Sequence, residues 1–430
     1  METIHTRIKE GITLHCIPSD KFTSDSLSVH FIVPLREETA TAYSLLPRVM
    51  KKGSADYPTQ ELINKRLEEL YAASVTMGVS KLCEYESFFV SINMLDNRFS
   101  FDGTDITAGA LALAESLLFS PLAENGAFSA DIVSREKRLH KDRIRSQINN
   151  KSNYASIRAR EIMCENEPYR VSVGGREEKV DKITPASLYQ SYLHILSTAR
   201  VDVIYVGKMD PDTVKELLHG FFDRLAPRAF TDEGEVLIDS VKETRRVREI
   251  VLAKQGNLVL GFRTPAKKEE DLCAMRLFEM VYGASPVSKL FMNVREKLSL
   301  CYHCSARADR RTGVMLVSAG IENKNAALAE NEILKQLDEI REGNITDAEI
   351  SCAKEAMYDI LRTIPDSQIM MESWCLQHAR QGSEETPADL MEKIKALTRE
   401  DIVRVAQKIS LDTVYFLEGS ESGEEEDEDV

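Results

Sequence analysis

The chain has 430 residues, of which 43% are hydrophobic, and carries a formal net charge of −15 at pH 7. This length and composition predict two to three domains with substantial hydrophobic cores. The negative charge argues against nucleic-acid binding, because phosphates would be repelled.

No run approaches the about 18 consecutive apolar residues that a membrane span requires. The first residues also lack the apolar core of a secretion signal. We therefore expect no membrane association and a cytoplasmic location.

The first half of the chain predicts a sheet covered by helices. Its expected strands are 11–17, 27–33, 75–79, 87–93 and 201–206. Its expected helices are 40–52, 62–70, 106–118, 128–150, 154–164, 184–196 and 210–222.

A weakly patterned, charged stretch at 227–244 follows and predicts a linker. Beyond it a similar order of elements recurs, which suggests an ancient duplication. The second set of strands is expected at 257–262, 300–307, 314–320 and 413–417. The second set of helices is expected at 272–282, 289–297, 326–342, 347–364, 369–381, 387–396 and 399–409.

The first two predicted helices are joined by a short turn. Apolar residues recur four positions apart along 40–52, so one stripe of this helix would face a core. Gly53 ends the helix, and Thr59 is placed to cap the next one. With the Lys52-Gly53-Ser54 turn between the helices, this arrangement resembles the insulinase/pitrilysin family of zinc peptidases, which includes the mitochondrial processing peptidases.

In active members of that family the first helix carries the motif His-x-x-Glu-His shortly before such a turn. Aligned on the turn, Ser44, Pro47 and Arg48 stand where the first His, the general-base Glu and the second His would be. A serine hydroxyl binds zinc poorly, proline offers neither ligand nor base, and arginine stays cationic. Zinc and the water that it activates need neutral imidazole, anionic ligands and a base.

The third zinc ligand of the family is a Glu seven residues after another Glu, in a run that resembles Arg-Glu-Lys. Arg135-Glu136-Lys137 matches that run, and Arg143 occupies the ligand position. The histidines include no pair four residues apart that could replace the lost ligands. We therefore predict no bound metal and no cofactor.

Arg48 and Arg143 at former ligand positions leave two interpretations. Two guanidiniums converging in a partly buried pocket would require a carboxylate or phosphate between them. The alternative, which we favour, is a decayed pocket in which both side chains reach solvent or nearby acids. The helix around Arg143 is rich in basic residues, so it is either a wall that attracts acidic peptides or partners, or a solvated face.

The resemblance covers nearly the whole chain except the linker and the tail. It continues in Pro168-Tyr169, Gly174-Gly175, Ile183-Thr184, the run 202–207 with Asp210, and 289–302. It implies an α+β, insulinase/LuxS-metallohydrolase-like fold with two homologous domains, each a mostly antiparallel sheet packed against helices. The expected divisions are a domain at 1–226, the linker 227–244, a domain at 245–418, and a disordered acidic tail at 419–430.

Arg295 and Tyr302 lie in the segment that resembles the family in the second half. There, an Arg and a Tyr at this spacing hold the substrate backbone near the scissile bond. A guanidinium can donate to peptide carbonyls, and a phenol can donate to an oxygen that becomes negative in the transition state. In the alternative interpretation, Arg295 pairs with a nearby acid and Tyr302 fills the core.

The remaining candidate motif is Cys301-Tyr302-His303-Cys304. A metal site would need a second Cys or His pair, and a redox site would need its first cysteine at a helix start. On a regular strand the two thiols would point to opposite faces. We expect reduced, structural cysteines here, as for the scattered others.

We consider three functions, and the first is a non-catalytic, substrate-binding subunit that pairs with an active zinc peptidase of the same family. Family members usually enclose a chamber with four homologous domains, so two domains imply a partner. That partner would be a zinc-bearing homologue in a heterodimer, or a second copy in a homodimer, acting on a peptide or protein substrate. The second possibility is a metal-free scaffold or peptide-binding protein. A metal-less bacterial group of the family, usually encoded beside a homologue that keeps the motif, is associated with modification of elongation factor P.

The third possibility is an enzyme with another mechanism. No Ser-His-acid, Cys-His or paired-carboxylate arrangement can be argued from spacing, so this is the least favoured.

Overall fold

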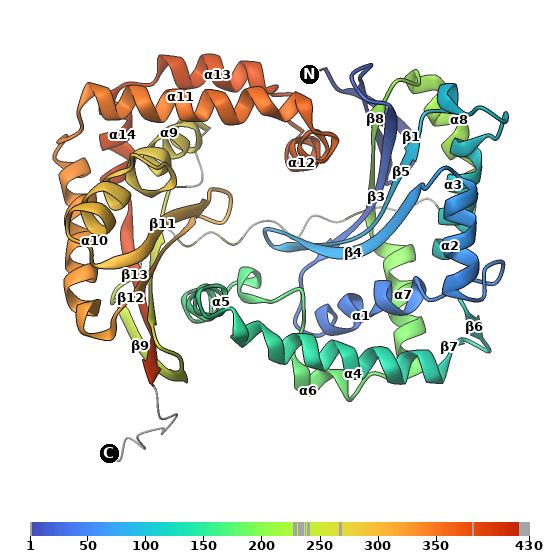
Figure 1. The fold of residues 1–430 in the computed structure, drawn as a ribbon, viewed down its shortest axis with the longest axis horizontal. Coiled ribbons are helices and arrows are strands. Elements are labelled where there is room, and N and C mark those ends of the chain that lie inside the picture. The colour runs from blue at the N-terminus through green and yellow to red at the C-terminus, as the bar shows by residue number, and fades with distance from the viewer. Residues whose placement is uncertain are drawn as a thin grey trace. The chain divides into compact units, whose positions relative to one another are not determined.

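The computed structural model describes residues 2–226, 230, 236, 238, 241–265, 269–380 and 382–420. The chain forms two compact units, each with one sheet and its helices (Figure 1). The first unit comprises Met1–Arg145, Val171–Gly234 and Thr363–Thr386. The second comprises Ser146–Arg170, Glu235–Arg362 and Pro387–Val430.

The first unit contains a six-stranded sheet whose middle strands are buried on both faces. Its strands, in spatial order, are β1 (Ile4–Lys9), β2 (Ile12–Pro18), β8 (Arg200–Gly207), β3 (Ser24–Pro34), β5 (Tyr85–Leu95) and β4 (Ser74–Leu82). All neighbours are antiparallel except β2 and β8. A separate hairpin joins β6 (Ala123–Glu124) to β7 (Ala127–Phe128).

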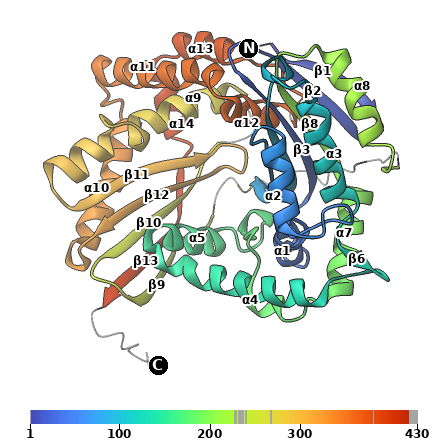
Figure 2. The ribbon, with the colours of Figure 1, turned by 45° about the vertical axis from the view of Figure 1, so that its right-hand side comes forward.

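The helices of the first unit bury their apolar faces against this sheet and one another. Thr59, as predicted, caps α2 through its side chain, and α2 lies beside α3 (Figure 2). The helices that the first half of the sequence contributes to this unit are α1 (Ala40–Met50), α2 (Gln60–Glu69), α3 (Ile106–Phe119), α4 (Ala130–Ser146), α6 (Glu177–Val180), α7 (Pro185–Thr198) and α8 (Pro211–Phe221).

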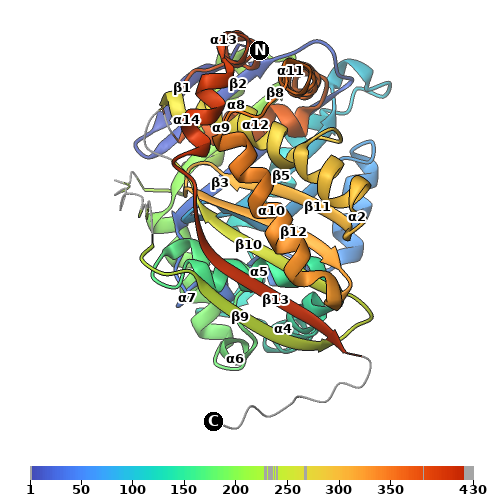
Figure 3. The same ribbon diagram turned by 90° about the vertical axis from the view of Figure 1, so that its left-hand side faces the viewer.

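The second unit contains a five-stranded sheet, seen face-on in Figure 3. Its strands are β11 (Cys301–Asp309), β12 (Val314–Ile321), β10 (Gly256–Arg263), β13 (Ser410–Ser420) and β9 (Arg245–Leu252). Its helices are α9 (Glu269–Glu279), α10 (Ala326–Arg341), α11 (Asp347–Thr363), α13 (Pro387–Ala396) and α14 (Arg399–Ala406). The helix expected at 272–282 ends in a π-helix, Met280–Ala284. The helix expected at 289–297 is also a π-helix, Leu290–Lys297.

The two sheets share one topology. The order β2-β8-β3-β5-β4 in the first sheet matches β9-β13-β10-β12-β11 in the second, strand for strand along the chain. The first pair is parallel and the other pairs are antiparallel in both. The predicted α+β fold of two mostly antiparallel sheets with covering helices is confirmed, and the shared topology supports the expected duplication.

Two equivalent helices are exchanged between the halves of the sequence. Helix α5 (Lys151–Met163) packs on β10, β12 and β13 of the second unit, where Ala155 and Ala159 meet Val259 and Tyr415. Helix α12 (Gln368–Ala379) packs on β8 of the first unit. The predicted contiguous division at 226 and 245 assigns each of these helices to the half whose sheet it does not cover.

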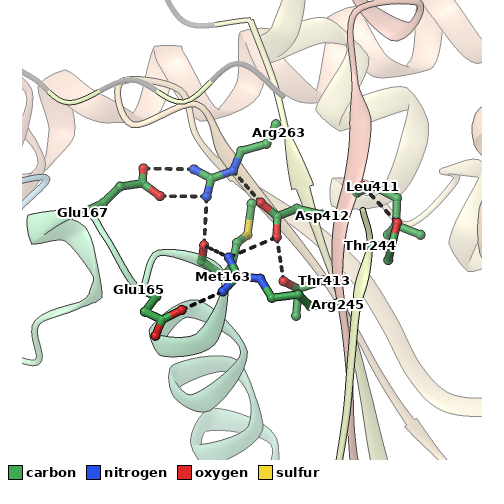
Figure 4. Close-up of polar contacts among 9 residues, drawn as sticks. All are labelled: Met163, Glu165, Glu167, Thr244, Arg245, Arg263, Leu411, Asp412 and Thr413. Carbon is green, nitrogen blue, oxygen red and sulfur yellow. Dashed lines mark hydrogen bonds and ion pairs between the residues drawn. The ribbon is translucent and has the colours of Figure 1, made fainter. Parts of the chain in front are cut away.

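The carbonyl at the end of each exchanged helix accepts a hydrogen bond from an arginine. Arg263 of β10 donates to Met163 O at 2.9 Å and also pairs with Glu167 and Asp412 (Figure 4). In the first unit, Arg200 donates to Ala379 O at 3.2 Å and to Asp202. These contacts satisfy helix-end carbonyls that the helix itself leaves unpaired.

Strand β13 extends further than predicted. It runs from Ser410 to Ser420, and its last residues, Gly419 and Ser420, pair with β9. Residues 419 and 420 therefore belong to the sheet, whereas the rest of the predicted tail lies outside the described residues. So does much of the predicted linker. Among the helices described, none is long and apolar enough to cross a bilayer.

Candidate functional site

All three replaced motif positions lie on α1, as predicted. Pro47 is buried inside the helix, three residues before its end. Proline removes one backbone donor and disturbs the preceding turn, but α1 continues, with the N–H of Lys51 donating to Pro47 O at 3.3 Å.

Ser44 contacts a histidine that the sequence did not single out. Ser44 Oγ lies 3.0 Å from His140 Nε2 and 3.0 Å from Thr41 O, and Nε2 lies 3.0 Å from Gly174 O. A carbonyl oxygen can only accept, so Nε2 carries the proton and the Ser44 hydroxyl donates to Thr41. The sequence signal that could have identified His140 is its spacing from Glu136 and Arg143, which places all three residues on one face of α4.

The imidazole of His140 is neutral. Burial lowers its pKa to about 4, and the nearby Arg48 guanidinium contributes to this. Its Nδ1 is buried and has no hydrogen-bond partner. The site therefore retains one nitrogen lone pair of the kind that could bind a metal.

A glycine turn closes over the start of α1 and supplies the Gly174 carbonyl. Gly175 has a φ of +73°, and a Cβ there would lie 2.4 Å from Thr41 Cα. Only glycine fits this close, left-handed turn. Gly174 and Gly175 thus form a turn that holds the start of α1.

Glu136 is buried beside these groups. Lys52 Nζ lies 3.4 Å from its Oε1, and Arg135 Nε lies 3.8 Å away. Lys52, from the turn after α1, therefore neutralises the carboxylate that the resembled motif retains.

Arg48 is half-buried, and its Nε–H is buried without an acceptor. Burial and then the charge of Arg143 lower the pKa of Arg48. Burial, followed by Arg48, Lys52 and Arg143, also lowers the pKa of Lys51. The surroundings of the former zinc position are thus cationic, and the decayed pocket, which we favour over an anion site, stays a prediction.

These residues do not fit a zinc ion. His140 and Glu136 could supply at most two ligands, fewer than the three protein ligands of a catalytic zinc. The nearby cations would repel the metal. Within the described residues, no group of three or more His, Cys, Asp or Glu side chains could hold a metal ion.

The basic helix α4 uses three of its cationic side chains to hold residues 177–183. Lys137 donates to Asp181 O and Ile183 O, and Lys141 pairs with the Asp181 carboxylate at 2.5 Å. Arg145 pairs with Glu177 at 2.5 Å. The charges of Lys141 and Arg145 are paired with carboxylates within the first unit, so these two side chains add little to any positive wall.

Arg295 belongs to a π-helix that packs on β11, the edge strand that carries Tyr302. Arg295 is near the end of the π-helix Leu290–Lys297, where its guanidinium stacks on Phe291 at 4.7 Å and lies 3.5 Å from Glu296. Tyr302 is 55% exposed on the edge strand β11. The charge of Arg295 acts on Cys301 and His303, which flank Tyr302.

The expectation that Cys301 and Cys304 face opposite ways is wrong. The pairing of β11 with β12 shifts by one residue between Cys301 and His303, as in a β-bulge. Both cysteines are therefore buried on the same face, at 8% and 5% exposure, and their thiols form a hydrogen bond. The alternation argument failed because the strand is irregular at this one step.

Residues 182–357 match the family profile described as the peptidase M16 inactive domain. A Bacillus subtilis protein, named as probable inactive metalloprotease YmfF, is 31% identical over 419 residues, covering 96% of each chain.

Solved structures agree. The structure of a conserved protein from Enterococcus faecalis is 28% identical, with a TM-score of 0.91 over 99% of this chain and 100% of the other. A peptidase M16 inactive domain from Pseudomonas fluorescens shares the fold at 15% identity, with a TM-score of 0.81 over 99% of this chain and 100% of its own. The chain belongs to the insulinase/pitrilysin (M16) family of metallopeptidases, as one of the inactive homologues that lack the zinc motif.

Proposed function

We propose that this chain is the non-catalytic, substrate-binding subunit of a cytoplasmic, insulinase-family peptidase heterodimer. In this proposal it contributes half of a chamber, with Arg295 and Tyr302, to a homologue that carries the zinc. The observation that carries the proposal is a contrast between the units. The residues at the former zinc position do not suffice to bind the metal, whereas Tyr302 is exposed on the edge strand and the charge of Arg295 acts on its neighbours Cys301 and His303.

The surroundings of the pair suit contact with a peptide. Stacking on Phe291 restricts the Arg295 side chain, so less rotamer entropy is lost when it binds. A π-helix, which is often found at functional sites, carries it. Tyr302 lies on β11, an edge strand of the described sheet, and its side chain is exposed.

The proposal is tested by reconstitution with a homologue that has an intact His-x-x-Glu-His motif and copurifies with this chain. Turnover of fluorogenic peptides is then measured. Arg295→Ala or Tyr302→Phe should lower turnover by about 10²-fold or more, the scale for losing one transition-state donor. Assembly, followed by size-exclusion chromatography, should not change.

Arg362 and Tyr358 on α11 offer matched controls, because the guanidinium of Arg362 lies over the Tyr358 ring as that of Arg295 lies over Phe291. Arg362→Ala and Tyr358→Phe should leave turnover at the level of the unmodified protein. Full turnover in both the Arg295 and Tyr302 variants would contradict the proposed role of these residues and leave only the scaffold function. An assembly of this chain, with itself or a partner, that hydrolyses no peptide would favour the metal-free peptide-binding alternative, including the link to elongation factor P.

A further inference from the structure

The irregular start of β11 brings two thiols within reach of each other. Cys301 pairs with Ile321 and Cys304 with Ala319, so three residues of β11 span only two steps of β12. Two strand steps correspond to about 6.6 Å, whereas three would give about 10 Å. The shorter spacing lies at the upper end of the Cα–Cα range of disulfides.

The two thiols differ in reactivity. The hydrogen bond from Cys304 lowers the pKa of Cys301; burial opposes this, and the Arg295 guanidinium lowers it further. The pKa of Cys304 is raised by the same hydrogen bond and by burial. One thiol is thus disposed to form the attacking thiolate, and the other stays protonated beside it.

Two other buried cysteines are less reactive. Burial raises the pKa of both Cys16 and Cys375 to about 12, which makes them unreactive. Cys352 is exposed on α11 and is the natural reference for an ordinary thiol.

We propose that Cys301 and Cys304 form a dithiol site that reacts with small-molecule disulfides of the glutathione class to give an intramolecular disulfide. The Cys301 thiolate attacks one sulfur of the disulfide and releases one thiolate. Cys304 then loses its proton and attacks Cys301 Sγ, which releases the second. Overall, two protein thiols and one small disulfide become one protein disulfide and two small thiols.

Entry to the site is from the edge of the sheet. Cys301 is the first residue of β11, and no strand pairs with the free side of β11 in the described sheet. Just before it, Ser299 has a φ of +51°, a strained conformation for a residue with a side chain. Opening of this strand end would expose Cys301 without unfolding the unit.

The experiment incubates the full-length protein with mixtures of reduced and oxidised glutathione, stops exchange with acid, and alkylates the free thiols. Peptide mass spectrometry then identifies each modified cysteine. We expect a disulfide-linked peptide containing Cys301 and Cys304, formed at least about tenfold faster than the modification of Cys352. Cys304→Ser should stop the reaction at a mixed disulfide on Cys301.

Two further variants separate the site from general thiol chemistry. Cys352→Ser should form the disulfide at the normal rate. Arg295→Ala should move the pH profile of Cys301 alkylation to higher pH, because a cation that favours the thiolate has been removed. Glutathione found on Cys352 while Cys301 stays unmodified, or an unchanged loss of thiols in the Cys301→Ser/Cys304→Ser protein, would overturn the proposal.

Discussion

His140 brings a neutral imidazole into the interior of the first unit, three residues before the arginine at the third former ligand position. Its Nε2–H is held by the Gly174 carbonyl. Replacing Ser44 with histidine would place a second imidazole beside it, but Arg48 would remain next to both. Loss of metal binding here therefore involved a change in the charge of the whole pocket as well as loss of ligands.

The buried His140 predicts a loss of stability in acid. Its pKa is lowered from the ordinary 6.5 to about 4 in the folded protein. Between these pH values the unfolded chain binds a proton that the folded protein does not, so the free energy of unfolding falls as the pH falls. The contribution is complete above pH 6.5 and is lost by about pH 4; it amounts to about 3 kcal/mol.

This is measured by urea unfolding at several pH values. His140→Gln, which keeps a side-chain donor, should flatten the dependence between pH 4 and 6.5. His219→Gln, at an exposed position on α8, serves as the control and should leave it unchanged. Equal slopes in the His140 variant and the unmodified protein would contradict the assignment.

Single positions were predictable where a motif gave them an alignment. Ser44, Pro47, Arg48 and Arg143 were placed by counting from Lys52-Gly53-Ser54 and Glu136. His140 was missed because its role depends on a carbonyl 34 residues away. The shared face of the thiols was missed because a one-residue shift in strand pairing leaves no mark in composition.

At the scale of elements, the Arg263 cluster fixes the end of the exchanged helix α5 to the second sheet. Arg263 is 0% exposed, and its guanidinium lies 2.8 Å from the Asp412 carboxylate and 2.7 Å from the Glu167 carboxylate. Both carboxylates are also buried. Such a group stabilises one arrangement mainly because any partial version leaves an unpaired charge in the interior.

Arg263→Met should therefore lower the free energy of unfolding by about 3–5 kcal/mol, the scale for removing one partner of a buried pair. Chemical denaturation measures this. Arg246→Met is a suitable control, because Arg246 on β9 forms an exposed ion pair with Glu330 and should cost about 0–1 kcal/mol. Similar losses in the two variants would show that burial of the cluster does not matter.

The type of most elements could be predicted, but where they pack could not. Apolar periodicity placed α5 and α12 within a few residues of their observed bounds, because one stripe of each must be buried. Periodicity does not say which sheet a stripe covers. The π-helical turn around Arg295 was also beyond prediction, since its side-chain pattern differs little from that of an α-helix over eight residues.

For the whole molecule, the exchange of α5 and α12 means that neither half of the sequence contains all the helices that cover its own sheet. The sequence predicted the two large sheets and most of their strands, but it missed β1 and β9. It gave no sign of the exchange, which joins segments more than 80 residues apart, such as Met163 and Arg245.

Residues 1–226 and 245–430, produced as separate polypeptides, should each lack stable tertiary structure, because an apolar sheet face and an apolar helix would both be exposed. Mixed or produced together, they should form a folded complex. Near-UV circular dichroism and size-exclusion chromatography would follow this. Two halves that each unfold cooperatively on their own would show that the exchanged helices are dispensable.

The exchange also bears on how such a chain arose. If each half descends from one ancestral unit, that unit carried a helix that belonged on the sheet of another copy. Its stable form was then a domain-swapped homodimer, and gene fusion turned an association between two molecules into one within a single chain. After fusion the two halves could diverge in sequence, so that one could keep or lose a metal site without a change in the other. Arg200 on β8 and Arg263 on β10 illustrate this divergence. Each donates to the carbonyl at the end of an exchanged helix, but the two arginines lie on strands that are not equivalent.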